Sequence, residues 1–106
     1  MSETNWSDTE KKAAHEAFKK AYEREINSLI EEIKQKTIAI DEIEQLWVLH
    51  DFLSARRHQI DGKYDDRCSS LIFVLAQLLK EEWISLEELQ ALDRDKLAKI
   101  SALTRM

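Results

Sequence analysis

The chain contains almost no residues that interrupt a helix. Among its 106 residues there is no proline, and Gly62 is the only glycine. Because these two residue types punctuate turns and strands, a chain that lacks them has few ways to build a sheet. Charged residues make up 35% of the sequence and are interleaved with Leu, Ile, Ala and Gln, a mixture typical of helical proteins. The sequence therefore predicts an all-α fold, and its length predicts one domain over residues 1–106.

A capping-box spacing opens the first predicted helix. Ser7 and Glu10 stand in the S-x-x-E arrangement, in which each side chain bonds the backbone N–H of the other residue. Apolar residues then recur at steps of three and four as far as Lys36, which predicts a long amphipathic helix that packs on one side only. This apolar stripe comprises Ala14, Phe18, Tyr22, Ile26, Leu29 and Ile33.

The β-branched residues among 37–40 interrupt this pattern weakly, and we expect a short bend there. Asp41 would then cap a second helix that runs to about Ile60. The alternative is that the first helix continues into the second with only a kink. Gly62 follows at the position where a left-handed residue commonly ends a helix. Residues 7–62 would form a long two-helix stem.

The rest of the chain, about 64–106, predicts a compact helical head. The run 71–79 is apolar nearly all round, which is typical of a buried helix. Helix-start signals precede three helices, and they lie at Asp65 or Asp66, at Ser85 with Glu88, and at Asp93. The last helix carries apolar residues on one face and basic residues on the other, namely Leu97, Ile100 and Leu103 against Lys96, Lys99 and Arg105.

The second helix is apolar on two sides. Read as a heptad, its first seam of alternating a and d positions comprises Ile43, Leu46, His50, Leu53, Arg57 and Ile60. A second stripe comprises Val48, Phe52 and Ala55. The first helix can cover one side, so we expect a symmetric copy of the second helix to cover the other in a homodimer. Trp47 lies next to the seam, where tryptophan is typical of interface hot spots.

Two charges of this helix suit an intermolecular pair. Asp51 and Arg57 are six residues apart, a spacing that does not bring side chains together on one helix. If two copies cross antiparallel near Ser54, Asp51 of one copy lies opposite Arg57 of the other. The alternative, which the spacing leaves equally open, is that both are ordinary surface charges.

Charge and composition exclude several classes of protein. The formal net charge is -5 and the pI is about 5.2, so the chain repels nucleic acid and anionic membranes. No apolar run could cross a bilayer, and the first residues lack the features of a signal peptide. Cys68 is the only cysteine, which excludes an internal disulfide and favours a cytosolic protein.

Few residues could carry catalysis or bind a metal. His50 and His58 are eight residues apart, which is not a metal-ligand spacing. Cys68 stands beside an apolar run and is more typical of a small core residue than of a nucleophile. We therefore expect no enzyme activity, no metal and no cofactor. A thiol or metal enzyme that uses these three residues is the disfavoured alternative.

Three runs, residues 46–58, 60–67 and 73–81, closely resemble the cyanobacterial family of fluorescence recovery proteins. The resemblance covers nearly the whole chain, including the Trp6-Ser7 opening. It is weakest in the N-terminal tail and in residues 34–40.

The resemblance implies an all-helical dimer that regulates photoprotection. It implies binding to the C-terminal domain of the red, photoactivated form of orange carotenoid protein, faster return of that form to the orange state, and its detachment from the phycobilisome. It also implies a cytoplasmic location beside the phycobilisomes, near the thylakoid membrane. A dimeric helical adaptor without a carotenoid-protein partner is the alternative function.

The resemblance also assigns roles to residues. By position, it implies that Trp47, His50, Asp51 and Arg57 form the functional cluster, and that Leu46 lies in the dimer interface. It implies that Phe73 and Lys99 of the head contact the partner. The chain has the family's residue at each of these positions.

Overall fold

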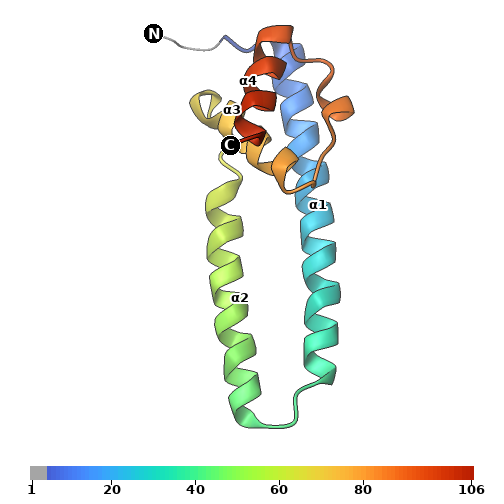
Figure 1. Ribbon diagram of the computed structural model, residues 1–106, viewed down its shortest axis with the longest axis vertical. Coiled ribbons are helices and arrows are strands. Elements are labelled where there is room, and N and C mark those ends of the chain that lie inside the picture. Colours follow the sequence, from blue (N-terminus) through green and yellow to red (C-terminus); the bar gives the residue numbers. More distant parts are fainter. Residues whose placement is uncertain (1–4) are drawn as a thin grey trace.

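The structure is a computed structural model that describes residues 5–106 (Figure 1). Within those residues every regular element is helical, which confirms the all-α prediction. The molecule is extended and measures 53 × 26 × 25 Å. Its elements are α1 (Asp8–Ile38), α2 (Ile43–Lys63), α3 (Cys68–Lys80), the 3-10 helix η1 (Leu86–Leu89) and α4 (Arg94–Thr104).

Helix α1 runs through both parts of the molecule (Figure 1). Its first half packs against α3 and η1 and buries mostly small residues, which let other helices approach closely: Ala14, Ala17, Phe18 and Ala21. The sequence analysis assigned all of residues 7–62 to the stem. The structure instead places the first half of α1 in the head core, beside Leu71, Leu75, Leu78, Leu89 and Ile100.

The second half of α1 and the antiparallel α2 form the stem. The bend between them is confirmed, and α1 ends at Ile38. Charged side chains of the two helices make contacts across the stem. The Phe52 ring lies between Lys36 Nζ and the Arg56 guanidinium, at 4.8 and 5.0 Å from its centroid. Arg56 also lies 3.7 Å from a carboxylate oxygen of Glu32. The stem is therefore a thin two-helix layer without an enclosed core.

The predicted start of α2 was wrong by one residue. The N-cap is Glu42 and not Asp41. The reason is Gln45, whose side-chain oxygen accepts hydrogen bonds from both free backbone N–H groups, at 2.6 Å from Asp41 N and 2.9 Å from Glu42 N.

The predicted end of α2 was also wrong. Gly62 lies inside the helix without a positive φ, and α2 continues to Lys63. The chain turns at Tyr64, which has φ -89° and ψ 64°, and Asp65 N donates to Lys63 O at 3.0 Å. This arrangement is an inverse γ-turn, so no left-handed glycine is needed.

The capping predictions for the head were largely correct. The Ser7–Glu10 and Ser85–Glu88 capping boxes are both present, and Asp93 caps α4. The exception is α3, whose N-cap is Arg67. Asp65 instead accepts hydrogen bonds from the Arg67 backbone N–H and the Ser70 hydroxyl, both at 3.0 Å.

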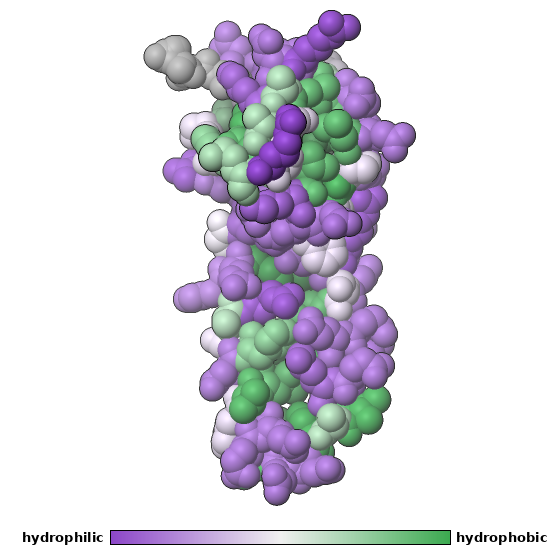
Figure 2. All heavy atoms as spheres, in the orientation of Figure 1, coloured by the Kyte–Doolittle hydropathy of each residue, from purple (hydrophilic) through white to green (hydrophobic). Residues whose placement is uncertain are grey.

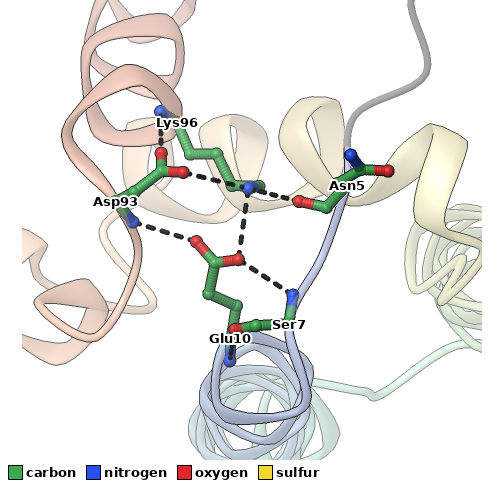
Figure 3. Close-up of polar contacts among 5 residues, drawn as sticks. All are labelled: Asn5, Ser7, Glu10, Asp93 and Lys96. Atoms are coloured by element: carbon green, nitrogen blue, oxygen red, sulfur yellow. Dashed lines mark hydrogen bonds and ion pairs between the residues drawn. The ribbon is translucent and has the colours of Figure 1, made fainter.

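Lys96 is buried, which contradicts its predicted place on the solvent face of the last helix. Its ammonium group donates to Asn5 O at 2.6 Å, Glu10 Oε1 at 3.2 Å and Asp93 Oδ2 at 3.3 Å (Figure 3). Burial alone would raise the pKa of Glu10, but hydrogen bonds from Ser7 N, Asp93 N and Lys96 lower it to about 2. The cluster ties the first turn of α1 to the start of α4 and closes the head.

Candidate functional site

The stem carries large apolar side chains at its surface. Trp47 is 58% exposed and Val48 is 68% exposed. Ile43, Leu46 and Leu53 are also exposed. Figure 2 shows hydrophobic surface over the lower half of the molecule, where the stem lies. Because large exposed apolar side chains are typical of interaction sites, the stem has the character of a contact surface.

Three residues of the predicted functional cluster lie together on α2. The Trp47 and His50 rings are 6.3 Å apart in an edge-to-face arrangement, and His50 Nδ1 lies 3.3 Å from Asp51 Oδ1. All three side chains are exposed, so they form one polar and aromatic patch. Arg57 is about two turns further along the helix, and its Nε lies 3.6 Å from Asp61 Oδ2. Among the described residues Asp51 and Arg57 form no ion pair with each other, as their spacing predicts.

The predicted dimer seam is only partly free. Ile43, Leu46 and Leu53 are open to solvent, but Ile60 is only 6% exposed because its own chain covers it. Ile60 therefore has little surface to offer a second copy, so the predicted seam would extend no further than Arg57.

An apolar groove of about 610 Å³ adjoins this seam between α1 and α2. Leu53 lies on its α2 side, and the lining is otherwise from α1: Leu29, Ile30, Ile33, Lys34, Thr37 and Ile38. This groove was not predicted, because the apolar stripe of the first helix was expected to be covered within the chain.

The two head residues of the predicted site are both accessible. Phe73 is 63% exposed, so the prediction that its helix is buried all round was wrong on this side. Phe73 lines a groove of about 800 Å³ between head and stem, together with Gln59, Val74 and Trp83. Lys99 lies exposed on α4. No contact joins either residue to the α2 patch in the described chain.

Sequence reasoning also missed a polar cluster where head and stem meet. Lys63 Nζ donates to Glu25 Oε2 at 2.8 Å and to Glu81 Oε1 at 2.6 Å, and Tyr64 Oη donates to Glu25 Oε1 at 2.8 Å. Burial raises the pKa of Tyr64, and its bond to Glu25 raises it further. These partners are far apart in the sequence, so no local pattern could have predicted the cluster. We call these four residues the neck cluster.

The residues of the disfavoured enzyme alternative stay apart. Cys68 is exposed at the first turn of α3, which contradicts the expectation of a core position. The part of the chain that the structure describes contains no group of three His, Cys, Asp or Glu side chains that could hold a metal ion. None of its helices is long and apolar enough to span a membrane.

Comparison with known proteins decides the family. Residues 6–104 match the sequence profile described as photoprotection regulator fluorescence recovery protein. The chain is also 53% identical over 104 residues to the Fluorescence recovery protein of Synechocystis sp., covering 98% of this chain and 95% of that protein. The chain belongs to the fluorescence recovery protein family.

Solved structures of this family have the same fold. The Fluorescence Recovery Protein of Fremyella diplosiphon is 55% identical and superimposes with a TM-score of 0.92, covering 96% of this chain and 100% of that one. The protein of Synechocystis sp PCC 6803 gives the same TM-score and coverage at 53% identity. The family is one of photoprotection regulators and not of enzymes, as the resemblance implied.

Proposed function

We propose that this chain is a homodimeric regulator of orange carotenoid protein. The dimer binds the C-terminal domain of the photoactivated red form, speeds its return to the orange form and promotes its detachment from the phycobilisome. Photoprotective quenching then ends. The observation that carries the proposal is the exposed patch of Trp47, His50 and Asp51 on a stem with uncovered apolar residues, in a chain of the fluorescence recovery protein family.

The dimer forms through α2, with two copies antiparallel and crossing near Ser54. Leu46 and Leu53 supply the apolar contact, and the groove beside Leu53 accepts side chains of the other copy. Burying such surface is favourable by about 25 cal/mol per Å². In this arrangement Asp51 of each copy lies opposite Arg57 of the other. Their present partners, His50 and Asp61, are exposed and hold them only weakly.

The regulator makes and breaks no covalent bond. The partner has two conformations separated by a barrier, and a protein that binds the transition between them better than the starting state lowers that barrier. If the regulator also binds the orange form more tightly than the red form, it shifts the populations as well.

Two separated contact surfaces suit this mechanism. One is the α2 patch of Trp47, His50, Asp51 and Arg57, and the other is the head patch of Phe73 and Lys99. Both patches are exposed, and they lie on different elements of a long molecule. Binding one partner segment at each patch raises the effective concentration of one segment near the other. The site of action is the cytoplasm beside the phycobilisomes, where the partner is attached.

The deciding experiment times the dark red-to-orange recovery of photoactivated orange carotenoid protein by absorbance. The wild-type protein should accelerate recovery, and Trp47→Ala should remove most of that acceleration. Val48→Ala is the matched control because Val48 is also an exposed apolar residue of α2 but lies outside the patch. Absence of acceleration by the folded wild type would favour the alternative, a dimeric adaptor with another partner.

A charge swap separates dimerisation from direct contact. Asp51→Arg and Arg57→Asp each place like charges opposite one another in the proposed dimer, and the double variant restores opposite charges. A double variant that is dimeric but does not speed recovery would show that these side chains touch the partner. A dimeric double variant with normal recovery would show that they act through the dimer alone.

A further inference from the structure

The neck cluster of Glu25, Lys63, Tyr64 and Glu81 joins three separate parts of the chain. Glu25 comes from the middle of α1, Lys63 is the last residue of α2, and Glu81 directly follows α3. Tyr64 packs edge-to-face on Phe18 and Tyr22 of α1, with ring centroids 5.9 and 5.5 Å apart. The end of α2 is thus fixed to both the α1 spine and the head.

The rest of α2 packs less closely on the chain. Helix α2 lacks the close backbone packing that α1 and α4 make with α3. Along the stem it is held by the Phe52 stack and the 3.7 Å Arg56–Glu32 pair, and its first end joins α1 through a short turn. The angle between α2 and the head therefore depends mainly on contacts at the neck.

The Lys63 ammonium group is the centre of those contacts. Its side chain is 13% exposed, and that of Glu25 is 5% exposed. Glu81 also accepts hydrogen bonds from Gln77 and from Trp83 Nε1, so it is itself fixed to the head. Removing the lysine charge would leave two carboxylates facing each other at a partly buried position, which they would relieve by moving apart.

We propose that Lys63 is a positioning residue for the regulator's action on its partner: it fixes the angle between the α2 patch and the head patch. The inference rests on the proposed function. A regulator that bridges two partner segments needs its two patches at a set separation, because a loose link lowers the effective concentration of the second contact. Each patch alone still binds its own segment when the neck is loose.

The test compares Lys63→Met with Lys63→Arg and with a matched control. Lys63→Met keeps much of the side-chain volume and removes the charge, whereas Lys63→Arg keeps the charge. The control is Arg24→Met, which removes the 2.8 Å bond from Arg24 to Trp83 O and the pair of 2.9 Å bonds from Arg24 to Glu88. That pair joins α1 to η1 inside the head and does not touch α2. Both methionine variants therefore lose a bridge of α1, but only one loses the hold on α2.

Recovery of the photoactivated partner is measured over a range of regulator concentrations. Lys63→Met should lower the maximal recovery rate by about fivefold or more, with less than about a twofold change in the half-saturating concentration. Lys63→Arg should restore most of the maximal rate, and Arg24→Met should leave it close to wild type. Equal slowing by Arg24→Met and Lys63→Met would overturn the proposal, because it would indicate general destabilisation of the head.

A distance measurement tests, in the absence of the partner, whether Lys63 fixes the position of α2 relative to the head. Spin labels are attached at Ala55→Cys on α2 and Gln90→Cys in the head, both exposed sites, in a Cys68→Ser background. Labelled chains are diluted with unlabelled ones so that distances within one chain dominate. Lys63→Met should broaden the distance distribution, whereas Arg24→Met should leave it narrow. A narrow distribution in Lys63→Met would overturn the positioning role.

A milder variant is available at Glu81. If Lys63→Met does not fold by circular dichroism, Glu81→Gln is the milder variant, because it loosens the head side of the neck and keeps the 2.8 Å Lys63–Glu25 bond. Glu81→Gln should broaden the distribution of label distances and lower the maximal recovery rate, both to a smaller extent than Lys63→Met. If the wild type fails to accelerate recovery, the proposed function falls, but the distance measurement still decides whether Lys63 holds α2 to the head.

Discussion

The head and the stem of this protein use apolar residues in opposite ways. The head encloses them, and Leu71, Leu75, Leu78, Leu89 and Ile100 are fully buried there. The stem leaves several of them at the surface, and its two helices lack the close backbone packing that α3 and α4 make in the head. Because burial of apolar surface is the main favourable term in folding, the head accounts for the stability of the single chain. The stem instead has surface available for association.

The largest expected effect tests the stem as an association surface. Leu46→Glu places a charge in the proposed seam, where burial without a partner is strongly unfavourable. The dimer should weaken by at least about 100-fold, equivalent to about 3 kcal/mol, and light scattering should give the monomer mass. Val48→Glu is the control on the other side of α2 and should stay dimeric. Intact dimers of Leu46→Glu would rule out this seam.

A second prediction compares leucine truncations in the two regions. Leu75→Ala leaves a cavity in the head and should lower the free energy of unfolding by about 2–5 kcal/mol. Leu53→Ala, made together with Leu46→Glu to remove the dimer, should cost under about 1 kcal/mol because that side chain is partly exposed. Urea denaturation followed by circular dichroism measures both. A larger loss at Leu53 would show that the stem has a core of its own.

Acid should act on the head through Glu10 and Glu88. The Arg24 guanidinium holds the pKa of Glu88 at about 2, and hydrogen bonds hold that of Glu10 at about 2, both below the ordinary value of 4.5. Their ionised forms therefore stabilise the fold above pH 4.5, and this contribution is lost as the pH falls toward 2. The unfolding midpoint in urea should decrease over that range. Glu10→Gln should flatten the decrease, and an unchanged profile in that variant would contradict the assignment.

The smallest expected effect concerns Gly62 on the stem. Nothing lies within 4 Å of the place where a Cβ would stand, and the residue has no positive φ. Gly62→Ala should therefore stabilise the monomeric chain by about 0.5 kcal/mol through the lower entropy of its unfolded state. Thermal unfolding in the Leu46→Glu background measures this gain. A loss of stability would contradict the open space around Gly62 in the single chain.

Features set by neighbouring residues were predictable from the sequence. The Ser7–Glu10 and Ser85–Glu88 boxes and the Asp93 cap depend on residues three positions apart, and all three formed. Helical spacing also predicted the apolar seam on α2, whereas the patch of Trp47, His50 and Asp51 was implied by the family resemblance. The family resemblance added the partner, which no spacing contains.

Features set by distant residues were not predictable. Lys96 was expected to face solvent because its helix is amphipathic, but Glu10 lies 86 residues away and supplies the charge that allows its burial. Gly62 was expected to end α2, but Tyr64 and its packing on α1 set the turn instead. The neck cluster needs partners 18 and 38 residues from Lys63, so only the fold could reveal it.

Because α1 is continuous, its length sets how the stem is rotated relative to the head. Its 31 residues form one uninterrupted helix shared by both regions. Each residue of a helix advances the chain by about 1.5 Å and turns it by about 100°. Inserting a single residue between the two halves of α1 would therefore rotate one region relative to the other by more than a quarter turn. The length of this helix is therefore constrained independently of the contacts that its side chains make.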